Sequence, residues 1–315
     1  MYKVIVTARS FGQANDAPIK LLEEHGCEVV RVATGKPLTT EELIPHIADA
    51  DAVIAGLDNY NKEVIEAGKK LKVISRYGVG YDKVDVCTAR AKDIAVTITP
   101  GANEHSVADL AMALMLSAAR HVTAVNADVK NGGWGRVMGG EMWQKTLGVI
   151  GLGRIGKGVV KRAKGFGMNV LCFEKYPDEA FGAEYGVTYT GIDTLIRNSD
   201  FITIHVPLLP DTKNLISDRE FDVMKKTAVI VNTARGGIID EKALYTALKE
   251  GKIAAAALDA TEVEPPKGSP LLELDNCIIT SHIGGFTRDA VNNMGMMAAQ
   301  NAIDVLEGRE CKFKV

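Results

Sequence analysis

Cysteine and long apolar runs are scarce in this chain of 315 residues, and each scarcity excludes a class of protein. The five cysteines are scattered without the spacing of metal ligands, and most lie in or beside apolar runs, as reduced core thiols do. No apolar stretch approaches the roughly 20 residues that cross a bilayer. The N-terminus lacks the charged, apolar and small-residue regions of a signal peptide. We therefore expect a cytoplasmic protein with no membrane partner.

An excess of positive charge is also missing. Lysine and arginine number 37 against 40 aspartate and glutamate residues, which gives a formal net charge of -3. No basic surplus is available for a nucleic-acid backbone, so a nucleic-acid partner is not expected. With 46% hydrophobic and 24% charged residues, the composition is that of a globular chain long enough for two domains.

Short apolar runs alternate with amphipathic segments, which is the pattern of parallel strands joined by helices. Five such runs in the first 100 residues predict a small doubly wound domain: 4–6, 29–30, 52–54, 73–74 and 95–96. Pro100-Gly101 then breaks the pattern, and a long helix is predicted over 102–120. A second series of six runs predicts a full dinucleotide-binding domain: 147–150, 169–173, 201–204, 228–231, 254–258 and 277–280. The final helix, 288–307, could return to the first domain.

A glycine-rich loop follows the first strand of the second series. Gly151 permits a tight turn, Gly153 lets the backbone approach a pyrophosphate, and Gly156 lets the following helix pack closely on the strand. The next strand ends at Glu174, near the spacing expected for the acid that binds the adenosine ribose. A carboxylate there repels a 2′-phosphate and favours NAD over NADP, although the adjacent Lys175 could tolerate that phosphate. The alternative for the loop is a purely structural glycine turn.

Three complementary side chains follow other strands of the same predicted sheet. His282 suits proton transfer because an imidazole titrates near neutrality. Glu264 is the natural carboxylate to orient its ring and stabilise the protonated form, although Glu262 is an alternative by charge alone. Arg235 supplies a planar fork that grips a carboxylate and reaches a carbonyl oxygen. His205 is a second acid/base candidate, interpreted as lining the cofactor. Each of these residues could instead be structural.

Several motifs together resemble the D-isomer-specific 2-hydroxyacid dehydrogenases, most closely the phosphoglycerate dehydrogenase branch. They are Arg76 to Asp82, Pro100 to Asn103, Gly151 to Gly156, Asn232 to Asp240, the loop carrying Glu264, and Ser281 to Gly285. The resemblance covers nearly the whole chain. It implies a Rossmann-type doubly wound parallel sheet domain over 100–286, and a smaller flavodoxin-like α/β substrate domain made from 1–99 and 287–315.

The resemblance also implies roles for individual residues. Arg235, Glu264 and His282 would be the catalytic trio, and Asp259 would hold the nicotinamide carboxamide of NAD. Arg76, Asn103 and the Val79-Gly80 backbone would bind the substrate. The cofactor-binding residues would be Gly151, Gly153, Arg154, Ile155, Gly156, Glu174, His205, Val206, Pro207, Thr212, Thr233, Ala234, Asp259 and Gly284. No metal is expected, because protein groups cover each role.

The chain departs from the family pattern in three places. Ser281 stands where a proline usually precedes the histidine, and Leu209 stands where a threonine is common. Members that act on phosphoglycerate often carry an arginine and a serine after the third strand of the first domain, whereas this chain has Ala55-Gly56. A phosphate dianion needs cationic partners, and Lys36 or Arg136 could supply the charge.

The sequence thus predicts reversible NAD-linked oxidation of a small D-2-hydroxy acid. D-3-phosphoglycerate is the first candidate, with hydroxypyruvate or glyoxylate close behind. An alternative of another class is a dinucleotide-sensing corepressor on the same scaffold. The resemblance implies a homodimer formed through the cofactor domain, by the helix after Pro100 and the loop near Trp134 and Trp143. Because the chain stops at Val315, feedback control through a further C-terminal domain is not expected.

Overall fold

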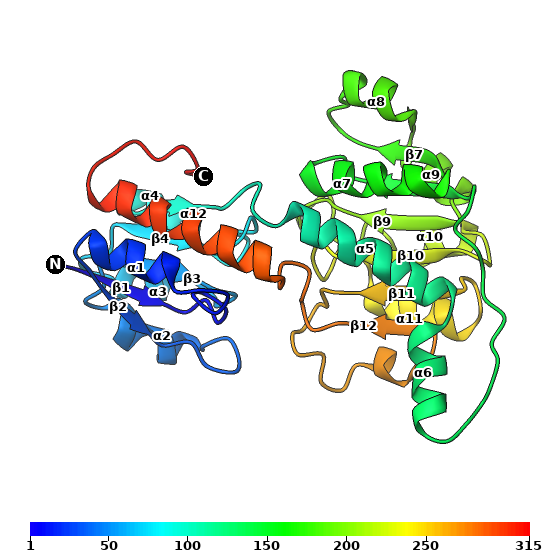
Figure 1. The fold of residues 1–315 in the computed structure, drawn as a ribbon, viewed down its shortest axis with the longest axis horizontal. Coiled ribbons are helices and arrows are strands. Elements are labelled where there is room, and N and C mark those ends of the chain that lie inside the picture. The colour runs from blue at the N-terminus through cyan, green and yellow to red at the C-terminus, as the bar shows by residue number, and fades with distance from the viewer. The chain divides into compact units, whose positions relative to one another are not determined.

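The computed structural model describes all residues from Met1 to Val315, and the chain divides into two compact units (Figure 1). Unit 1 comprises Met1–Asn103 and Gly285–Val315, and unit 2 comprises Glu104–Gly284. Unit 1 is therefore slightly longer than the predicted 1–99 and 287–315. The reason is packing: the backbone N–H of Thr99 donates to Gly78, and Ala102 packs against Met294, so the segment after Pro100 belongs to unit 1.

Unit 1 is built on a five-stranded parallel sheet in the order β2-β1-β3-β4-β5, which is the flavodoxin-like order. All five predicted strands are present. Their bounds are β1 (Tyr2–Val6), β2 (Cys27–Arg31), β3 (Ala52–Ala55), β4 (Val73–Arg76) and β5 (Ala95–Thr97). Because every strand is parallel, all carboxyl ends lie at one edge of the sheet, where open α/β sheets bind ligands.

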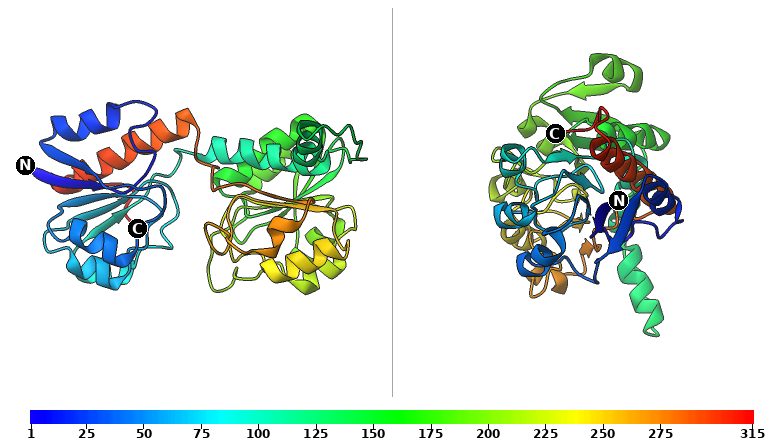
Figure 2. Two further views of the ribbon diagram at one scale, coloured as in Figure 1. Left: turned by 90° about the horizontal axis from the view of Figure 1, so that it is seen from below. Right: turned by 90° about the vertical axis from the view of Figure 1, so that its left-hand side faces the viewer.

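Helices cover both faces of this sheet (Figure 2). One face packs against α2 (Thr40–Ile47), α3 (Lys62–Ala67) and α4 (Val86–Ala91), and the other against α1 (Ala17–Glu24) and α12 (Arg288–Leu306). The predicted return of the C-terminal helix is confirmed. Its small residues Ala298 and Ala302 lie on the sheet, and Ser75 Oγ donates to the Ala298 carbonyl at 2.9 Å.

Unit 2 contains a seven-stranded parallel sheet in the order β12-β11-β10-β9-β6-β7-β8. Its strands are β6 (Thr146–Ile150), β7 (Asn169–Phe173), β8 (Val187–Tyr189), β9 (Phe201–Ile204), β10 (Val229–Asn232), β11 (Ala255–Leu258) and β12 (Cys277–Ile279). Six match the predicted runs. The edge strand β8 was not predicted, because its three residues include an exposed threonine, Thr188, and form no apolar run.

One face of the second sheet packs against α5 (Glu104–Ala119), α7 (Arg154–Ala163) and α8 (Glu179–Tyr185). The other packs against α9 (Ile192–Asn198), α10 (Asp218–Val223) and α11 (Glu241–Lys249). Helices thus cover both faces of the sheet, as in a Rossmann-type doubly wound domain. α6 (Val122–Lys130) buries no residue within the chain.

No single helix of the chain is long and apolar enough to cross a bilayer, and only α5 and α6 together, bent by 65°, meet the length and composition of one.

Candidate active site

The glycine loop lies between β6 and α7 in the geometry that a dinucleotide phosphate needs. Gly151 has a φ of +93°, and a Cβ on it would lie 2.8 Å from the carbonyl oxygen of His205. A Cβ on Gly156 would overlap the carbonyl oxygen of Gly151, which explains why α7 must begin with a glycine in its first turn. Gly153 is the N-cap of α7 and has nothing within 4 Å of a Cβ position. Open space at a helix N-terminus fits the pyrophosphate of a dinucleotide.

Glu174 follows β7 and is tied to this loop. Its Oε2 accepts the backbone N–H of Leu152 at 2.6 Å, and its Oε1 accepts that of Tyr176 at 3.0 Å. A carboxylate oxygen accepts more than one hydrogen bond, so the arrangement leaves room for a ribose hydroxyl. The neighbouring Lys175 is exposed, with its ammonium 5.8 Å from the ring centroid of Tyr176.

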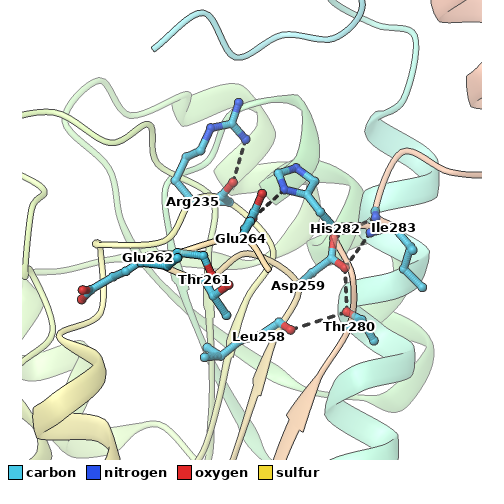
Figure 3. A network of polar contacts seen from close by, with 12 residues as sticks. Arg235, Leu258, Asp259, Thr261, Glu262, Glu264, Thr280, His282 and Ile283 are labelled. Atoms are coloured by element: carbon cyan, nitrogen blue, oxygen red, sulfur yellow. Dashed lines mark hydrogen bonds and ion pairs between the residues drawn. The ribbon is translucent and has the colours of Figure 1, made fainter. Parts of the chain in front are cut away.

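His282 and Glu264 meet beyond the ends of β12 and β11. Glu264 Oε1 lies 2.8 Å from His282 Nδ1, which leaves Nε2 as the free ring nitrogen. The His282 and Glu264 side chains are 25% and 22% exposed, so the pair is accessible but partly desolvated. The alternative partner, Glu262, points away (Figure 3), and its backbone N–H and carboxylate contact Glu241 instead. The structure therefore places Glu264, and not Glu262, against the imidazole.

Arg235 lies in the turn after β10, and its side chain projects to the same side of the loops as Glu264 and His282 (Figure 3). Its Nη1 donates to the carbonyl of Ala234 at 2.9 Å. The next residue, Gly236, carries no side chain because a Cβ would overlap the backbone of Thr261. This close approach holds the arginine turn against the loop that carries Glu264.

Asn232 is a site residue that the sequence reasoning missed. Its Nδ2 donates to the carbonyl of Arg235 at 2.7 Å, and its Oδ1 accepts the N–H of Ala234 at 2.9 Å. The amide thereby fixes the turn that presents Arg235. The available signal was an asparagine directly after a buried strand, a position that favours a side chain bonding to its own following turn.

Asp259 follows β11, is only 2% exposed, and has three donors from the chain itself. Its Oδ1 accepts Thr280 Oγ1 at 2.6 Å and the N–H of Ile283 at 2.8 Å, and its Oδ2 accepts the N–H of Gly284 at 2.8 Å. Asp259 therefore holds the segment that carries His282, whose φ is +56°. The predicted contact of Asp259 with nicotinamide stays a prediction.

His205 follows β9 in a different environment from His282. Its Nε2 lies 2.9 Å from Thr203 Oγ1, and its Nδ1 is buried without a partner. The residue is half-buried, and burial lowers the pKa of His205 to about 3. A histidine that stays neutral in this way suits lining a cofactor and does not suit donating a proton near neutral pH.

The other predicted cofactor-binding residues lie at the same edge of the second sheet. Thr212 Oγ1 closes the turn after Val206 and Pro207 by donating to the Pro207 carbonyl at 2.6 Å. The hydroxyl of Thr233 is buried without a partner in the turn before Arg235. Arg154 and Ile155 are the first residues of α7, and Gly284 is the last residue of unit 2.

The predicted substrate-binding residues lie in unit 1. Val79 and Gly80 belong to the loop after β4, and Val79 is exposed. Arg76 is 3% exposed: its Nε donates to the Gly80 carbonyl at 2.9 Å, and its Nη1 donates to the carbonyls of Ala55 and Gly56. Arg76 thus fixes the loop after β4 through the carbonyl of Gly80. Asn103 ends the first segment of unit 1, with its side chain near Gly285.

Lys36 and Arg136, the two candidate phosphate partners, lie in different units. Lys36 is exposed after β2, with its Nζ 3.8 Å from Glu42. Arg136 belongs to the exposed segment between α6 and β6. No group of three or more histidine, cysteine, aspartate or glutamate side chains is arranged to hold a metal ion.

The chain is similar in sequence and in fold to several known proteins. The chain is 49% identical over 98% of its length to a D-3-phosphoglycerate dehydrogenase of Methanocaldococcus jannaschii, and it spans 58% of that relative. It is 44% identical over 84% of its length to a hydroxypyruvate reductase of Thermotoga maritima, covering 87% of it. A crystal structure of a protein from Thermus thermophilus superposes with a TM-score of 0.90 at 37% identity, with 99% of each chain covered.

The family itself follows from a sequence profile. The profile for the NAD binding domain of D-isomer specific 2-hydroxyacid dehydrogenases matches residues 112–284, which is most of unit 2. This match confirms the family and the NAD-binding domain that the motifs predict. The chain belongs to the D-isomer specific 2-hydroxyacid dehydrogenase family.

Proposed function

We propose that this protein interconverts a small D-2-hydroxy acid and its 2-keto acid with NAD as the hydride carrier. The observation that carries the proposal is the contact of Glu264 with His282 beyond the sheet that also carries the glycine loop. Bound NADH supplies hydride to the keto carbon. The protein must then deliver a proton to the carbonyl oxygen and hold the substrate carboxylate.

The chain offers one group for each of these tasks. His282 delivers the proton from Nε2, because Nδ1 is held by Glu264. Arg235 binds the carboxylate and polarises the carbonyl, since a guanidinium makes two parallel hydrogen bonds to such a group. In unit 1, the Val79-Gly80 backbone of the loop after β4 is a further candidate for binding a carboxylate. Glu264 orients the imidazole through the reaction.

Our first candidate substrate pair is D-3-phosphoglycerate and 3-phosphohydroxypyruvate, supported by the relative of that name at 49% identity. Hydroxypyruvate or glyoxylate is the second candidate. It is supported by the relative named hydroxypyruvate reductase and by the absence of a cation at Ala55-Gly56.

Turnover tests the proposal directly. Purified protein is mixed with NADH and, in turn, 3-phosphohydroxypyruvate, hydroxypyruvate and glyoxylate, and NADH oxidation is followed by absorbance. We expect oxidation with at least one of them and a fall of about 10²- to 10⁴-fold in His282→Ala, with NADH binding retained. A wild-type protein that oxidises no NADH with any 2-keto acid would contradict the proposal and favour the corepressor alternative.

We also propose that the protein is a homodimer through unit 2. The support is an apolar surface between α5 and β6, where Trp134 is 80%, Met138 95% and Trp143 56% exposed. α6 adds the exposed side chains of Val122 and Val129. A surface of this kind marks an association site.

Light scattering tests the dimer. The wild type should have twice the mass of the chain, and Met138→Asp should shift toward the monomer because it places a charge in the apolar surface. Tyr176→Asp, a change at another exposed apolar side chain, is the control and should not shift the mass. A monomeric wild type would refute the dimer.

A further inference from the structure

Unit 1 ends its strands mostly in buried or paired groups, and the exceptions are two exposed cations, Arg9 and Arg31. Arg76 is buried on backbone carbonyls, and Lys36 has Glu42 within ion-pair distance. Arg9, which follows β1, is exposed, and no carboxylate lies within ion-pair distance of it. Its guanidinium makes one hydrogen bond, from Nη1 to the carbonyl of Gly35 at 2.9 Å. Four of about five N–H donors are therefore available to a ligand.

The end of the neighbouring strand β3 explains why a cation here must come from β1. A Cβ on Gly56 would lie 2.9 Å from the carbonyl oxygen of Thr7 and 3.1 Å from Cα of Ala8. The Gly56 N–H also donates to Thr7 Oγ1 at 2.9 Å, which fixes this close approach. The loop after β1 thus occupies the space where a side chain at position 56 would project. Any ligand group above β3 meets the residues of that loop, which are Arg9 and Ser10.

The same loop contacts the predicted substrate loop. Ser10 Oγ lies 3.4 Å from Tyr77 Oη, and the rings of Phe11 and Tyr77 make an edge-to-face contact with centroids 6.1 Å apart. Tyr77 is the first residue after β4 and leads directly to Val79 and Gly80. Packing therefore fixes the loop that carries Arg9 against the loop predicted to hold the substrate carboxylate.

The spacing of the strands sets the size of ligand that both loops can hold. Neighbouring strands lie about 4.8 Å apart, so the ends of β1 and β4, separated by β3, are about 10 Å apart. A three-carbon acid with a phosphate on its last carbon, together with the reach of an arginine side chain, covers this span. By this estimate, the unphosphorylated acid would not reach Arg9.

The charged groups near Arg9 are of both signs. Arg31 is exposed, and its Nη2 donates to the Arg9 carbonyl at 3.4 Å, which adds a second positive charge. Asp58, the acid after β3, is 3% exposed and its Oδ1 accepts the N–H of Leu38 at 2.7 Å. That carboxylate is buried beneath the loop, whereas the two guanidinium groups are exposed to an incoming anion.

We infer that Arg9, with the adjacent Ser10 hydroxyl, binds the phosphate of a 2-keto acid phosphorylated at its far end and so selects phosphorylated substrates. The inference rests on the proposed function and narrows its substrate class. Charge-assisted, two-point binding of a phosphate by a guanidinium is strong enough to discriminate substrates by one to two orders of magnitude.

The test compares kcat/KM for 3-phosphohydroxypyruvate and hydroxypyruvate in the wild type and three variants. Arg9→Gln should lower the value for the phosphorylated substrate about 10- to 100-fold and change the other by less than about threefold. Arg9→Lys should recover part of the loss, because it restores charge without the planar fork. Arg90→Gln, at an exposed arginine of α4, is the matched control and should change neither value.

Equal losses on both substrates, no loss in Arg9→Gln, or a wild type without preference for the phosphorylated acid would overturn the inference and leave the dehydrogenase intact. A calorimetric titration with inorganic phosphate separates the two proposals if no 2-keto acid is reduced. Binding by the wild type that disappears in Arg9→Gln, at an unchanged unfolding temperature, supports the phosphate site on its own. Equal binding in both, or none in the wild type, refutes it.

Discussion

In unit 2, the groups that follow the strands are side chains whose chemistry is visible in their residue types. His282 contacts Glu264, and Glu174 accepts a hydrogen bond from the backbone of the glycine loop. Asp259 accepts one from Gly284, in the segment that follows His282. In unit 1, the strands of a similar parallel sheet are followed by loops whose backbone is held by a buried side chain, Arg76, through the carbonyls of Gly80 and Ala55. Under the proposed function, the edge of unit 2 carries the chemistry in its side chains, and the edge of unit 1 binds the substrate through its loops and the residues on them. Changes at the first should act on turnover and cofactor binding, and changes at the second on substrate KM.

The largest expected effect concerns the two acids of the loop after β11 in unit 2. Glu264→Gln should lower kcat about 100-fold, because the amide cannot hold the protonated imidazole as a carboxylate does. Glu262→Gln is the matched control, since that side chain points away from His282, and it should retain nearly full kcat. Steady-state kinetics with saturating NADH measures both. If the two variants lose activity equally, the orienting role of Glu264 is wrong.

The glycine loop comes next, where two chemically identical changes should separate folding from binding. A Cβ at position 156 would overlap the Gly151 carbonyl, so Gly156→Ala should destabilise unit 2 by about 1–3 kcal/mol and weaken NADH binding. Gly153→Ala meets no neighbour within 4 Å and has an ordinary φ of -66°, so it should leave the unfolding free energy nearly unchanged. It should still weaken NADH binding about tenfold, because the new methyl group occupies the phosphate's approach.

Fluorescence titration with NADH and denaturant unfolding measure this pair. Full NADH affinity in Gly153→Ala would show that the pyrophosphate does not approach this residue, and it would weaken the assignment of the loop.

A smaller effect is expected at the other edge, in unit 1. Arg76→Lys keeps the charge but cannot reach the carbonyls of Gly80 and Ala55 together, because an ammonium lacks the planar fork. The loop at Val79 and Gly80 should loosen and raise the KM for the 2-keto acid several-fold to about tenfold, with the KM for NADH unchanged. A parallel rise in both KM values would show a general loss of structure in place of a loop effect.

The effect furthest from turnover is the pH dependence of stability, to which His205 contributes. Its pKa is lowered from 6.5 to about 3 by burial, so the unfolded chain binds one more proton than the folded chain between those values. This contribution is fully present above pH 6.5 and is lost as the pH falls toward 3, by at most about 1.4 kcal/mol per pH unit.

The unfolding free energy of wild type and His205→Gln, measured from pH 7 to about pH 4.5, tests this slope. The variant should lose stability less steeply on acidification, whereas His105→Gln, at an exposed histidine of α5, should follow the wild type. Identical slopes in wild type and His205→Gln would show that the ring is protonated in the folded protein.

The fold was predictable because its strands are buried on both faces. β1, β3, β9 and β10 form short, nearly continuous apolar runs that periodicity recognises. β8 was not predicted, because an edge strand with an exposed threonine lacks such a run. The boundary between the units differs by a few residues from the predicted one, since it depends on Ala102 packing against a helix much later in the chain.

By itself, the sequence determined the glycine loop, the family and the residue types of the candidate catalytic set. These features depend on short stretches of neighbouring residues, such as a strand, a turn and the first residues of a helix. Such stretches can be recognised directly in a sequence. Only the tertiary structure decided that Glu264 and not Glu262 faces His282, that Asn232 locks the turn of Arg235, and that Thr7 and Ala8 exclude any side chain at Gly56. The contact of Glu264 with His282 and the exclusion at Gly56 each depend on loops after different strands approaching one another, and such distances follow from how the sheet is packed. The Asn232 contacts lie within one turn, but they depend on the conformation that this turn adopts in the folded chain.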